Sequence, residues 1–228
     1  MHTVQQAMKR LSLDQKIQRE AWLEKIENEV VDHVDTQTLF REDLFLPYYF
    51  VEQKYPQVSK VISGITIYKN DNTALWRRLG LENAAGLYIR PLTMVLIMYS
   101  PNVPDDVVAV HELLHCAHDK MMLGNATVAQ EDMTFRASIP YLRQRKFADQ
   151  WIVDNYLFPY FFSLHLSRNP HLASTNTISS TPSGAKSVSD IARDKCWKIL
   201  EEEKGHAEPL PCEHDEPFPD TDRFDFID

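Results

Sequence analysis

The sequence has few cysteines, no long hydrophobic run and no excess of basic residues. Its three cysteines, Cys116, Cys196 and Cys212, are an odd number without the spacing of a disulfide framework, which favours free thiols in a reducing compartment. The longest apolar runs, such as MVLIMY, are far too short to cross a bilayer. The first residues carry charges with no apolar segment behind them. We therefore expect no secretory signal, no membrane partner and a cytoplasmic location.

The charge is acidic and unevenly distributed along the chain. The net charge is −9, and between Glu208 and Asp228 eight acids stand against one arginine, so the rest of the chain is nearly neutral. Proteins that bind nucleic acid normally present a basic face, and we therefore expect no nucleic-acid partner. Phe218, Phe224 and Phe226 lie between the acids of this tail. The tail is interpreted either as an extended segment that docks on a protein partner or on its own domain, or as a solvated segment that aids solubility.

Hydrophobic periodicity and composition divide the chain into regions. They are an N-terminal helix over residues 1–35, a main domain over 36–167, a Ser/Thr-rich linker over 168–187, and a short helix with the acidic tail over 188–228. Within the main domain, GITIYKN is predicted as a strand, and AAGLYIR and TMVLIMYS as two adjacent antiparallel strands. Helices are expected directly after Pro104, from near Thr127, and from about Pro140 to Leu166.

The stretch that bears most on function is HELLH, residues 111–115. Residues i and i+4 lie on the same face of an α-helix, so His111 and His115 can direct two imidazole nitrogens at one zinc ion, about 2 Å from each. Glu112 is rotated away from them and is predicted to act as the general base that takes a proton from a water activated by zinc. An ordinary helix that carries histidines is the competing interpretation. The cost of burying unpaired histidines on a mostly apolar helix counts against it.

The third ligand of this predicted zinc site has two candidates, because catalytic zinc normally has three protein ligands and one open position. Asp149 is predicted on the apolar face of its helix, where a carboxylate needs a metal or Arg145 as its partner. Glu131 lies near the start of the helix that follows HELLH, with Asp132 as a weaker neighbour. His118 would form a line rather than a tripod with the other two histidines, so we expect it outside the ligand set. The residues alone leave Asp149 and Glu131 as equal alternatives.

A peptidase site also needs a group that stabilises the oxyanion of the transition state. Tyr88 and Tyr99 are near in sequence, but neither can be assigned to this role from the sequence. Cys116, which follows His115 directly, faces away from the predicted ion on a helix and is expected to be a small core residue.

Residues 84–118, AAGLYIRPLTMVLIMYSPNVPDDVVAVHELLHCAH, resemble the core of small zincin metallopeptidases. They are most similar to the ImmA/IrrE-type regulatory peptidases and related phage-encoded metallopeptidases, in which a Gly-Leu-Tyr strand, a hydrophobic strand and a helix opening with Ala-His-Glu-x-x-His follow one another. Val110 departs from this pattern, since many relatives have alanine there. The resemblance covers roughly a sixth of the chain and depends mainly on HExxH. It implies zinc, hydrolysis of peptide bonds, a substrate lying along the strand before the helix, and a third ligand on the next helix.

These observations together predict an α+β, zincin-like fold, with a small antiparallel sheet packed on the histidine helix and further helices behind it. The predicted function is that of a zinc-dependent peptidase acting on a peptide or protein substrate, with His111 and His115 as ligands and Glu112 as the base. The alternative is a non-enzymatic metal-binding protein that keeps this fold for structure or assembly. A virion component is an example of this alternative. For the enzyme, packaging in a virion or action on one is an alternative to a purely cytoplasmic location.

Overall fold

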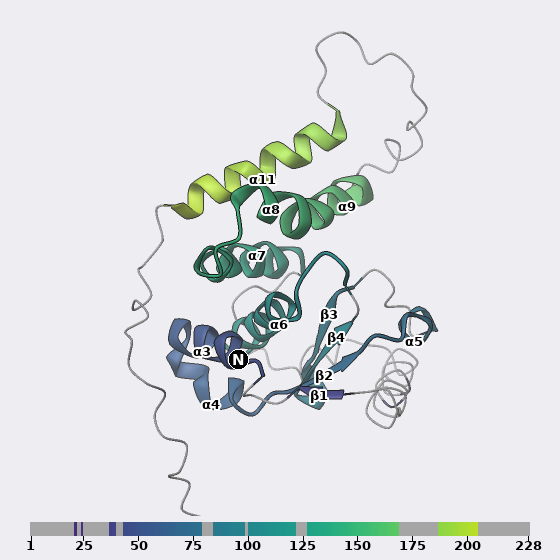
Figure 1. The fold of residues 1–228 in the computed structure, drawn as a ribbon, viewed down its shortest axis with the longest axis vertical. Helices are drawn as coiled ribbons and strands as arrows, with labels where there is room; N and C mark the ends of the chain where they lie inside the picture. Colours follow the sequence, from purple (N-terminus) through teal and green to yellow (C-terminus); the bar gives the residue numbers. More distant parts are fainter. Residues whose placement is uncertain are drawn as a thin grey trace, which may run out of the picture.

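The computed structural model describes residues 21, 24, 37–39, 43–78, 84–98, 100–121, 127–168 and 187–204. Ala21 and Glu24 are helical, and the rest of the predicted N-terminal helix lies outside these ranges. Nearly all of the predicted linker and the whole acidic tail after residue 204 also lie outside them. No helix in the described part of the chain is long and apolar enough to cross a membrane. Helices and a small sheet make up the described residues, which confirms an α+β architecture (Figure 1).

The strands of the described residues form one sheet in the order β1-β2-β4-β3. The strands are β1 (Gln37–Leu39), β2 (Thr66–Asn70), β3 (Gly86–Ile89) and β4 (Met94–Met98). β3 pairs with β4 in the antiparallel sense, as predicted, and β1 pairs with β2 in the same sense. β2 and β4, however, are parallel. The prediction of an antiparallel sheet was therefore wrong for the sheet as a whole, which is mixed.

The parallel pair follows from the way the chain returns to the sheet. Parallel neighbours need a crossover connection, and here α5 (Thr73–Arg78) and then β3 lie between β2 and β4 in the sequence. All five residues of β4 are buried, because this strand occupies the middle of the sheet and is covered on both faces. The apolar run was recognised in the sequence as a strand, but its direction relative to β2 depends on a contact distant along the chain.

Alternate residues of the central strands serve two hydrophobic cores, one on each face of the sheet. Val95 and Ile97 face the large core that the sheet shares with the helices. Met94, Leu96 and Met98 face a smaller core on the opposite side, closed by Trp76 of α5 and other apolar side chains. The large core is the one that carries the histidine helix.

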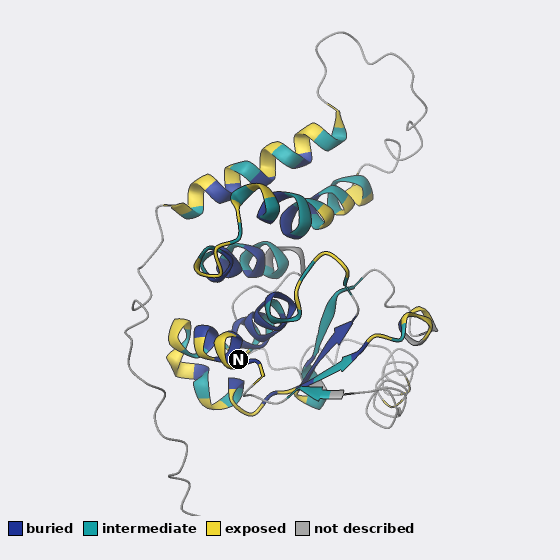
Figure 2. Ribbon diagram, viewed as in Figure 1, coloured by how far each residue is buried: buried dark blue, intermediate teal, exposed yellow. Residues whose placement is uncertain are grey.

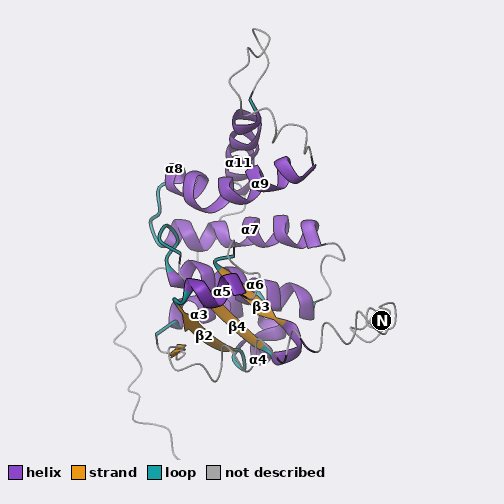
Figure 3. Cartoon of the chain, turned by 90° about the vertical axis from the view of Figure 1, so that its right-hand side faces the viewer, coloured by secondary structure: helices purple, strands orange, loops and turns teal. Residues whose placement is uncertain are grey.

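Apart from α5, the described helices stack in layers on one face of the sheet, as the two views in Figures 1 and 3 show. α6 (Asp105–Lys120) packs on β3 and β4, with α3 (Phe45–Lys54) beside it and the short η2 (Pro56–Val58) and α4 (Ser59–Ile62) next to α3. α7 (Thr127–Gln144) forms the next layer over α6. Beyond α7 lie α8 (Asp149–Trp151), η4 (Ile152–Leu157), α9 (Phe158–Arg168) and α11 (Val188–Lys204). α6 is consequently enclosed on most sides (Figure 2).

The helix predicted to begin near Pro140 does not begin there. α7 continues through Pro140 to Gln144, although proline lacks the N–H that would bond to the carbonyl four residues earlier. Burial of the neighbouring Ile139, Tyr141 and Leu142 offsets that loss. The chain instead turns after Gln144, where Lys146 has a positive φ of 61°. The following helical residues start afresh at Asp149, and η4 has π-helical hydrogen bonding just before Pro159.

The helix predicted over residues 188–204 is confirmed as α11. Its buried side chains Cys196, Ile199 and Leu200 belong to the same hydrophobic core as those of α6, α7 and α9. Its outer face is exposed (Figure 2). In the sequence this helix was placed with the acidic tail, outside the main domain, whereas its packing joins it to that domain.

Candidate metal centre

The N-terminus of α6 is fixed by two aspartates in its first turn. Asp105 accepts a hydrogen bond from the Lys69 ammonium group at 2.6 Å, which ties the helix to the end of β2. Asp106 accepts the Tyr141 hydroxyl at 2.8 Å and pairs with Arg145 at 3.0 Å, which ties the helix to α7. Negative charge at this end also complements the helix dipole. These contacts orient the helix so that His111 and His115 face α7 and Glu112 faces β3.

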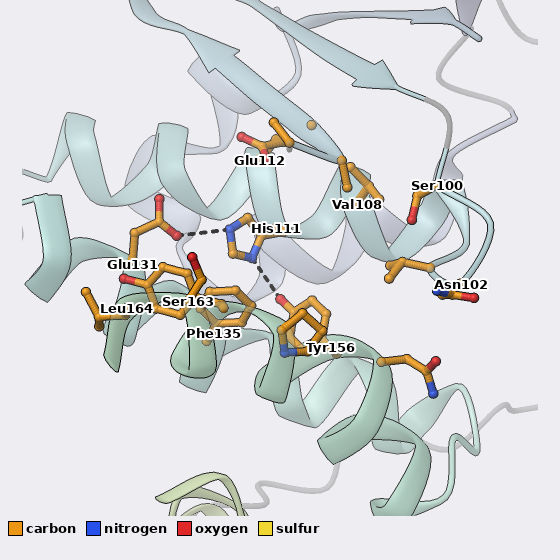
Figure 4. A pocket seen from close by; sticks show the side chains of 17 residues that line it. Ser100, Asn102, Val108, His111, Glu112, Glu131, Phe135, Tyr156, Ser163 and Leu164 are labelled. Atoms are coloured by element: carbon orange, nitrogen blue, oxygen red, sulfur yellow. Dashed lines mark hydrogen bonds and ion pairs between the residues drawn. The ribbon is translucent and has the colours of Figure 1, made fainter. Parts of the chain in front are cut away.

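His111, His115 and Glu131 converge across the interface between α6 and α7, and this group is called the metal cluster below. Figure 4 shows the contact between His111 and Glu131. The Nε2 atoms of the two histidines are 3.0 Å apart. One Glu131 carboxylate oxygen lies 3.4 Å from Nε2 of His111, and the other lies 3.2 Å from Nε2 of His115. Glu131 is in the second turn of α7, where the crossing of the two helices brings it opposite both rings.

The spacing of these atoms is compatible with one metal ion held between the three residues. Ligands about 2.0–2.1 Å from a tetrahedral metal are separated from one another by about 3.3–3.4 Å. The nitrogen–nitrogen separation of 3.0 Å and the nitrogen–oxygen separations of 3.4 and 3.2 Å, which involve different oxygens of Glu131, are near that value, and one ligand atom from each residue lies within 4.8 Å of the others. Two imidazoles and one carboxylate are also a donor set that zinc accepts, with one coordination position left open. The residues present therefore fit a zinc ion.

The electrostatics of the metal cluster favour a cation between its members. Burial by itself raises the pKa of Glu131, but hydrogen bonds with His111 and His115 outweigh it and hold this pKa well below its usual range. Burial lowers the pKa of His115, yet the hydrogen bond with Glu131 and the nearby Glu112 carboxylate raise it above its usual value. The two carboxylates thus favour the protonated form of His115, and a metal ion would replace that positive charge.

The other ring nitrogen of each histidine in the metal cluster meets a hydroxyl group. Nδ1 of His111 lies 2.8 Å from the Tyr156 hydroxyl of η4, and Nδ1 of His115 lies 3.4 Å from Oγ1 of Thr134 on α7. When Nε2 binds a metal, Nδ1 carries the ring proton and donates it to such a partner. Both hydroxyls consequently stabilise the tautomer and the ring orientation that metal binding requires.

His118 lies outside the metal cluster, as expected from the sequence, and is fully buried. Its Nδ1 is 3.0 Å from Thr134 Oγ1 and its Nε2 is 2.9 Å from the Tyr55 hydroxyl. We call Tyr55, His118 and Thr134 the buried polar line, since they connect α3 to the ring of His115. Burial and the positive charges of His115 and Lys54 lower the pKa of His118 to about 4. The ring is therefore neutral near pH 7 and has no free nitrogen for a metal.

Glu112 lies beside the metal cluster but on the sheet side of α6, and only 6% of its surface is exposed. Burial raises its pKa, while the positive charges of His111 and His115 and a backbone hydrogen bond from Tyr88 lower it, with the net shift upward. Gly86 of β3 makes this approach possible. A β-carbon at Gly86 would lie 2.5 Å from Val108 Cγ1 and 2.9 Å from Glu112 Cγ and Oε1, which is closer than such atoms pack.

Asp149, the other candidate for the third ligand, is not brought to the histidines. It lies at the start of α8 and pairs with Arg143 at 3.5 Å. An unbroken helix from Pro140 would place Asp149 on an apolar face, as predicted. The chain turns at Lys146, however, so the residues after it no longer continue the helical spacing of those before it. Asp132 is also engaged elsewhere, with Arg136 at 2.9 Å. The geometry thus favours Glu131.

A pocket of about 690 Å³ opens beside the metal cluster (Figure 4). It is lined by the beginning of β3, by the segment before α6, and by α6, α7, η4 and α9, and it includes His111, Glu112 and Glu131. Tyr156 and Tyr160 also line it and were not singled out in the sequence. Two hydroxyl-bearing side chains four residues apart in an otherwise apolar stretch were the available signal.

Of the tyrosines considered in the sequence, Tyr88 is not among the residues that line the pocket. Its hydroxyl is buried next to Cys116. Tyr99 lies outside the described residues. Cys116 itself is fully buried in the large core, in line with its predicted packing role.

Comparisons of the chain with protein-family models, with curated proteins and with solved structures found no match. The interpretation of the site depends on its own residues and their geometry.

Proposed function

We propose that this protein is a zinc-dependent peptidase with a zincin-like site. His111, His115 and Glu131 are the metal ligands, and Glu112 is the general base. The observation that carries the proposal is the coincidence of two imidazoles and a carboxylate, close enough to share one metal ion, with a buried glutamate and a pocket beside them. This coincidence also favours Glu131 over Asp149 as the third ligand.

A zinc ion in this position supplies a Lewis acid that polarises a substrate carbonyl and lowers the pKa of water towards neutrality. Glu112 takes the proton that the attacking water loses and delivers it to the amine nitrogen that leaves. Burial of Glu112 and the backbone hydrogen bond from Tyr88 hold the carboxylate in one orientation, between β3 and the metal cluster. Tyr156 and Thr134 keep the two imidazole rings directed at the ion.

The substrate backbone has a natural place along β3, which is the edge strand of the sheet. The Ala85 carbonyl accepts a hydrogen bond from the Met98 amide at 2.8 Å, so Ala85 faces β4. Because alternate residues of an antiparallel strand face its partner, the N–H and C=O of Gly86 face away from β4. Gly86 also lines the pocket. A peptide that adds to this edge would pass directly over Glu112 and the metal cluster.

A purely structural metal site is the competing function, and three observations favour catalysis over it. Structural zinc sites are normally closed by four protein ligands, whereas the metal cluster offers three among the described residues. Structural sites also have no need of a pocket, while here two of the three ligands, His111 and Glu131, line one. Glu112, which is not a ligand, would have no role in a structural site.

The test is a comparison of wild-type protein with Glu112→Gln, which preserves the shape of the side chain. We expect both proteins to bind one equivalent of zinc, measured by elemental analysis after gel filtration. We expect the variant to cleave a peptide library about 10²–10⁴-fold more slowly, because a general base contributes about that factor. A wild type that binds no zinc when zinc is supplied, or a variant that cleaves as fast as the wild type, would contradict the proposal.

A further inference from the structure

The walls of the pocket differ sharply in polarity from the metal cluster that they surround. Outside the metal cluster and Glu112, most side chains that line the faces contributed by α6, α7, η4 and α9 are apolar or aromatic, namely Val108, Phe135, Tyr156, Pro159, Tyr160 and Leu164. The polar exceptions are Asn155 and Ser163. No lysine or arginine is among the lining residues, and the only carboxylates are Glu112 and Glu131. Both carboxylates already have roles in the proposed site.

The aromatic rings of this wall are packed against one another and against the metal cluster. Phe135 lies with its ring centroid 4.7 Å from that of His111, 5.0 Å from Tyr156 and 4.7 Å from Tyr160. Phe161, which is buried, supports Phe135 from behind at 5.8 Å. Rings held in this way form a rigid surface that an aromatic or aliphatic side chain can cover without displacing them.

The two ends of the pocket differ as well. Figure 4 shows His111 between an end that carries Ser100 and Asn102 and an end that carries Leu164. Leu164 is partly buried on α9 and packs against the large core. The Leu164 end therefore offers an apolar side chain next to the reacting groups, with the Ser163 hydroxyl beside it, whereas the other end offers neutral hydrogen-bonding groups.

We propose that the pocket selects peptides with a large uncharged apolar or aromatic side chain next to the bond that is cleaved; this inference rests on the proposed peptidase function. A substrate lysine would have to lose its hydration with no unoccupied carboxylate to receive it. A substrate glutamate would meet no cation other than the metal. Burying a charge without a partner is far more costly than burying an apolar group, which gains free energy in the same place. The volume of about 690 Å³ is in the range that holds more than one side chain.

Binding and cleavage are measured separately to test this inference. The probes are fluorescein-labelled, capped hexapeptides of alanine in which both central residues are Phe, Leu, Lys or Glu. Their affinity is measured with zinc-loaded Glu112→Gln by fluorescence anisotropy, and their cleavage with the wild type by mass spectrometry. We expect the Phe and Leu peptides to bind and to be cleaved on the order of 100-fold better than the charged ones, since a poorly matched side chain costs about 10–200-fold in a pocket.

Leu164→Glu changes the wall without touching the metal cluster or Glu112, and Leu164→Met is its volume-conserving control. We expect the glutamate variant to improve the Lys peptide at least tenfold relative to the Phe peptide, with unchanged zinc content, while the methionine variant keeps the wild-type preference. Equal binding of all four peptides, binding of none, or no change of preference in Leu164→Glu would overturn the inference. Apolar peptides that bind selectively but are never cleaved would support the pocket inference and contradict the peptidase function.

Discussion

On α6, His111 lines the pocket and His115 lies beside it in the metal cluster, whereas His118, less than one turn beyond His115, is enclosed between α3 and α7. The side chains of His111 and His115 are each 12% exposed, and their Nε2 atoms meet only each other and Glu131. His118 has no exposed surface, and both its nitrogens are engaged by hydroxyl groups. The comparison shows that the partner elements around a helix, more than the residue type, decide whether a histidine can bind a metal.

The metal cluster and the buried polar line are two regions that Thr134 links, because its hydroxyl lies within reach of both His115 and His118. In the metal-binding tautomer, His115 donates from Nδ1 to Thr134, Thr134 donates to Nδ1 of His118, and His118 donates from Nε2 to Tyr55. In this arrangement each hydrogen bond joins one donor to one acceptor. The buried polar line thus orients a ligand of the metal cluster without binding the metal itself. Substitutions in each group test this difference.

Glu131→Gln should give the largest effect, because it replaces a charged ligand by a neutral amide of the same shape. We expect zinc affinity to fall by more than about 100-fold, since loss of a direct ligand exceeds the 10–100-fold that a supporting partner costs. Competition with a chelating dye measures this affinity. If zinc affinity stayed at the wild-type value, Glu131 would have no place in the metal cluster.

Thr134→Val should give the next largest effect, because it removes the hydroxyl and keeps the branched shape. We expect zinc affinity to fall by about 10–100-fold, as for other partners that orient a metal-bound histidine. Thr134→Ser retains the hydroxyl and is the matched control, with an affinity close to the wild type. Equal losses in the valine and serine variants would assign the effect to packing and would break the link between the two regions.

His118→Gln should lower stability far more than it lowers zinc binding. Loss of a buried hydrogen-bonded ring leaves the hydroxyls of Tyr55 and Thr134 poorly paired, which costs about 1–3 kcal/mol in the free energy of unfolding. Denaturant unfolding of the metal-free protein measures this, and zinc stoichiometry should remain at the wild-type value. Complete loss of zinc from a folded His118→Gln protein would contradict this expectation, because it would show that metal binding itself requires His118.

The free energy of unfolding should also depend on pH differently in His118→Gln and in the wild type. The folded pKa of His118 is depressed from about 6.5 to about 4, so between these values the unfolded chain binds the proton more tightly than the folded one. Stability of the wild type should therefore decline as the pH falls from 6.5 towards 4, and this decline should be shallower in His118→Gln. Unfolding curves of both proteins across that window make the comparison, and parallel curves would speak against a neutral buried ring.

Asp149→Asn should have the smallest effect. Its ion pair with Arg143 is long, at 3.5 Å, and both side chains are partly exposed, so we expect about 0.5 kcal/mol or less in stability. Zinc affinity should not change. A large loss of zinc affinity in this variant, with Glu131→Gln unaffected, would reverse the choice of third ligand.

The structural features around the metal cluster that the sequence predicted correctly are those governed by spacing within one helix or one hairpin. The positions of His111, His115 and Glu112 on α6 follow from the 3.6-residue period, and the antiparallel pairing of β3 with β4 follows from two β-prone runs with a short turn between them. The exclusion of His118 from the metal cluster followed from the same period. These features need no knowledge of contacts distant along the chain.

The remaining features depend on tertiary contacts. The choice of Glu131 requires the crossing of α7 over α6, and the rejection of Asp149 requires the turn at Lys146, which resets the phase of the following helix. The parallel pairing of β2 with β4 and the aromatic wall around Phe135 likewise join segments far apart in the sequence. The sequence by itself therefore determined which residues could bind a metal and act as a base. Only the packing of α7, η4 and α9 on α6 decided which carboxylate completes the metal cluster, because helical periodicity carries no information across a chain turn or between separate helices.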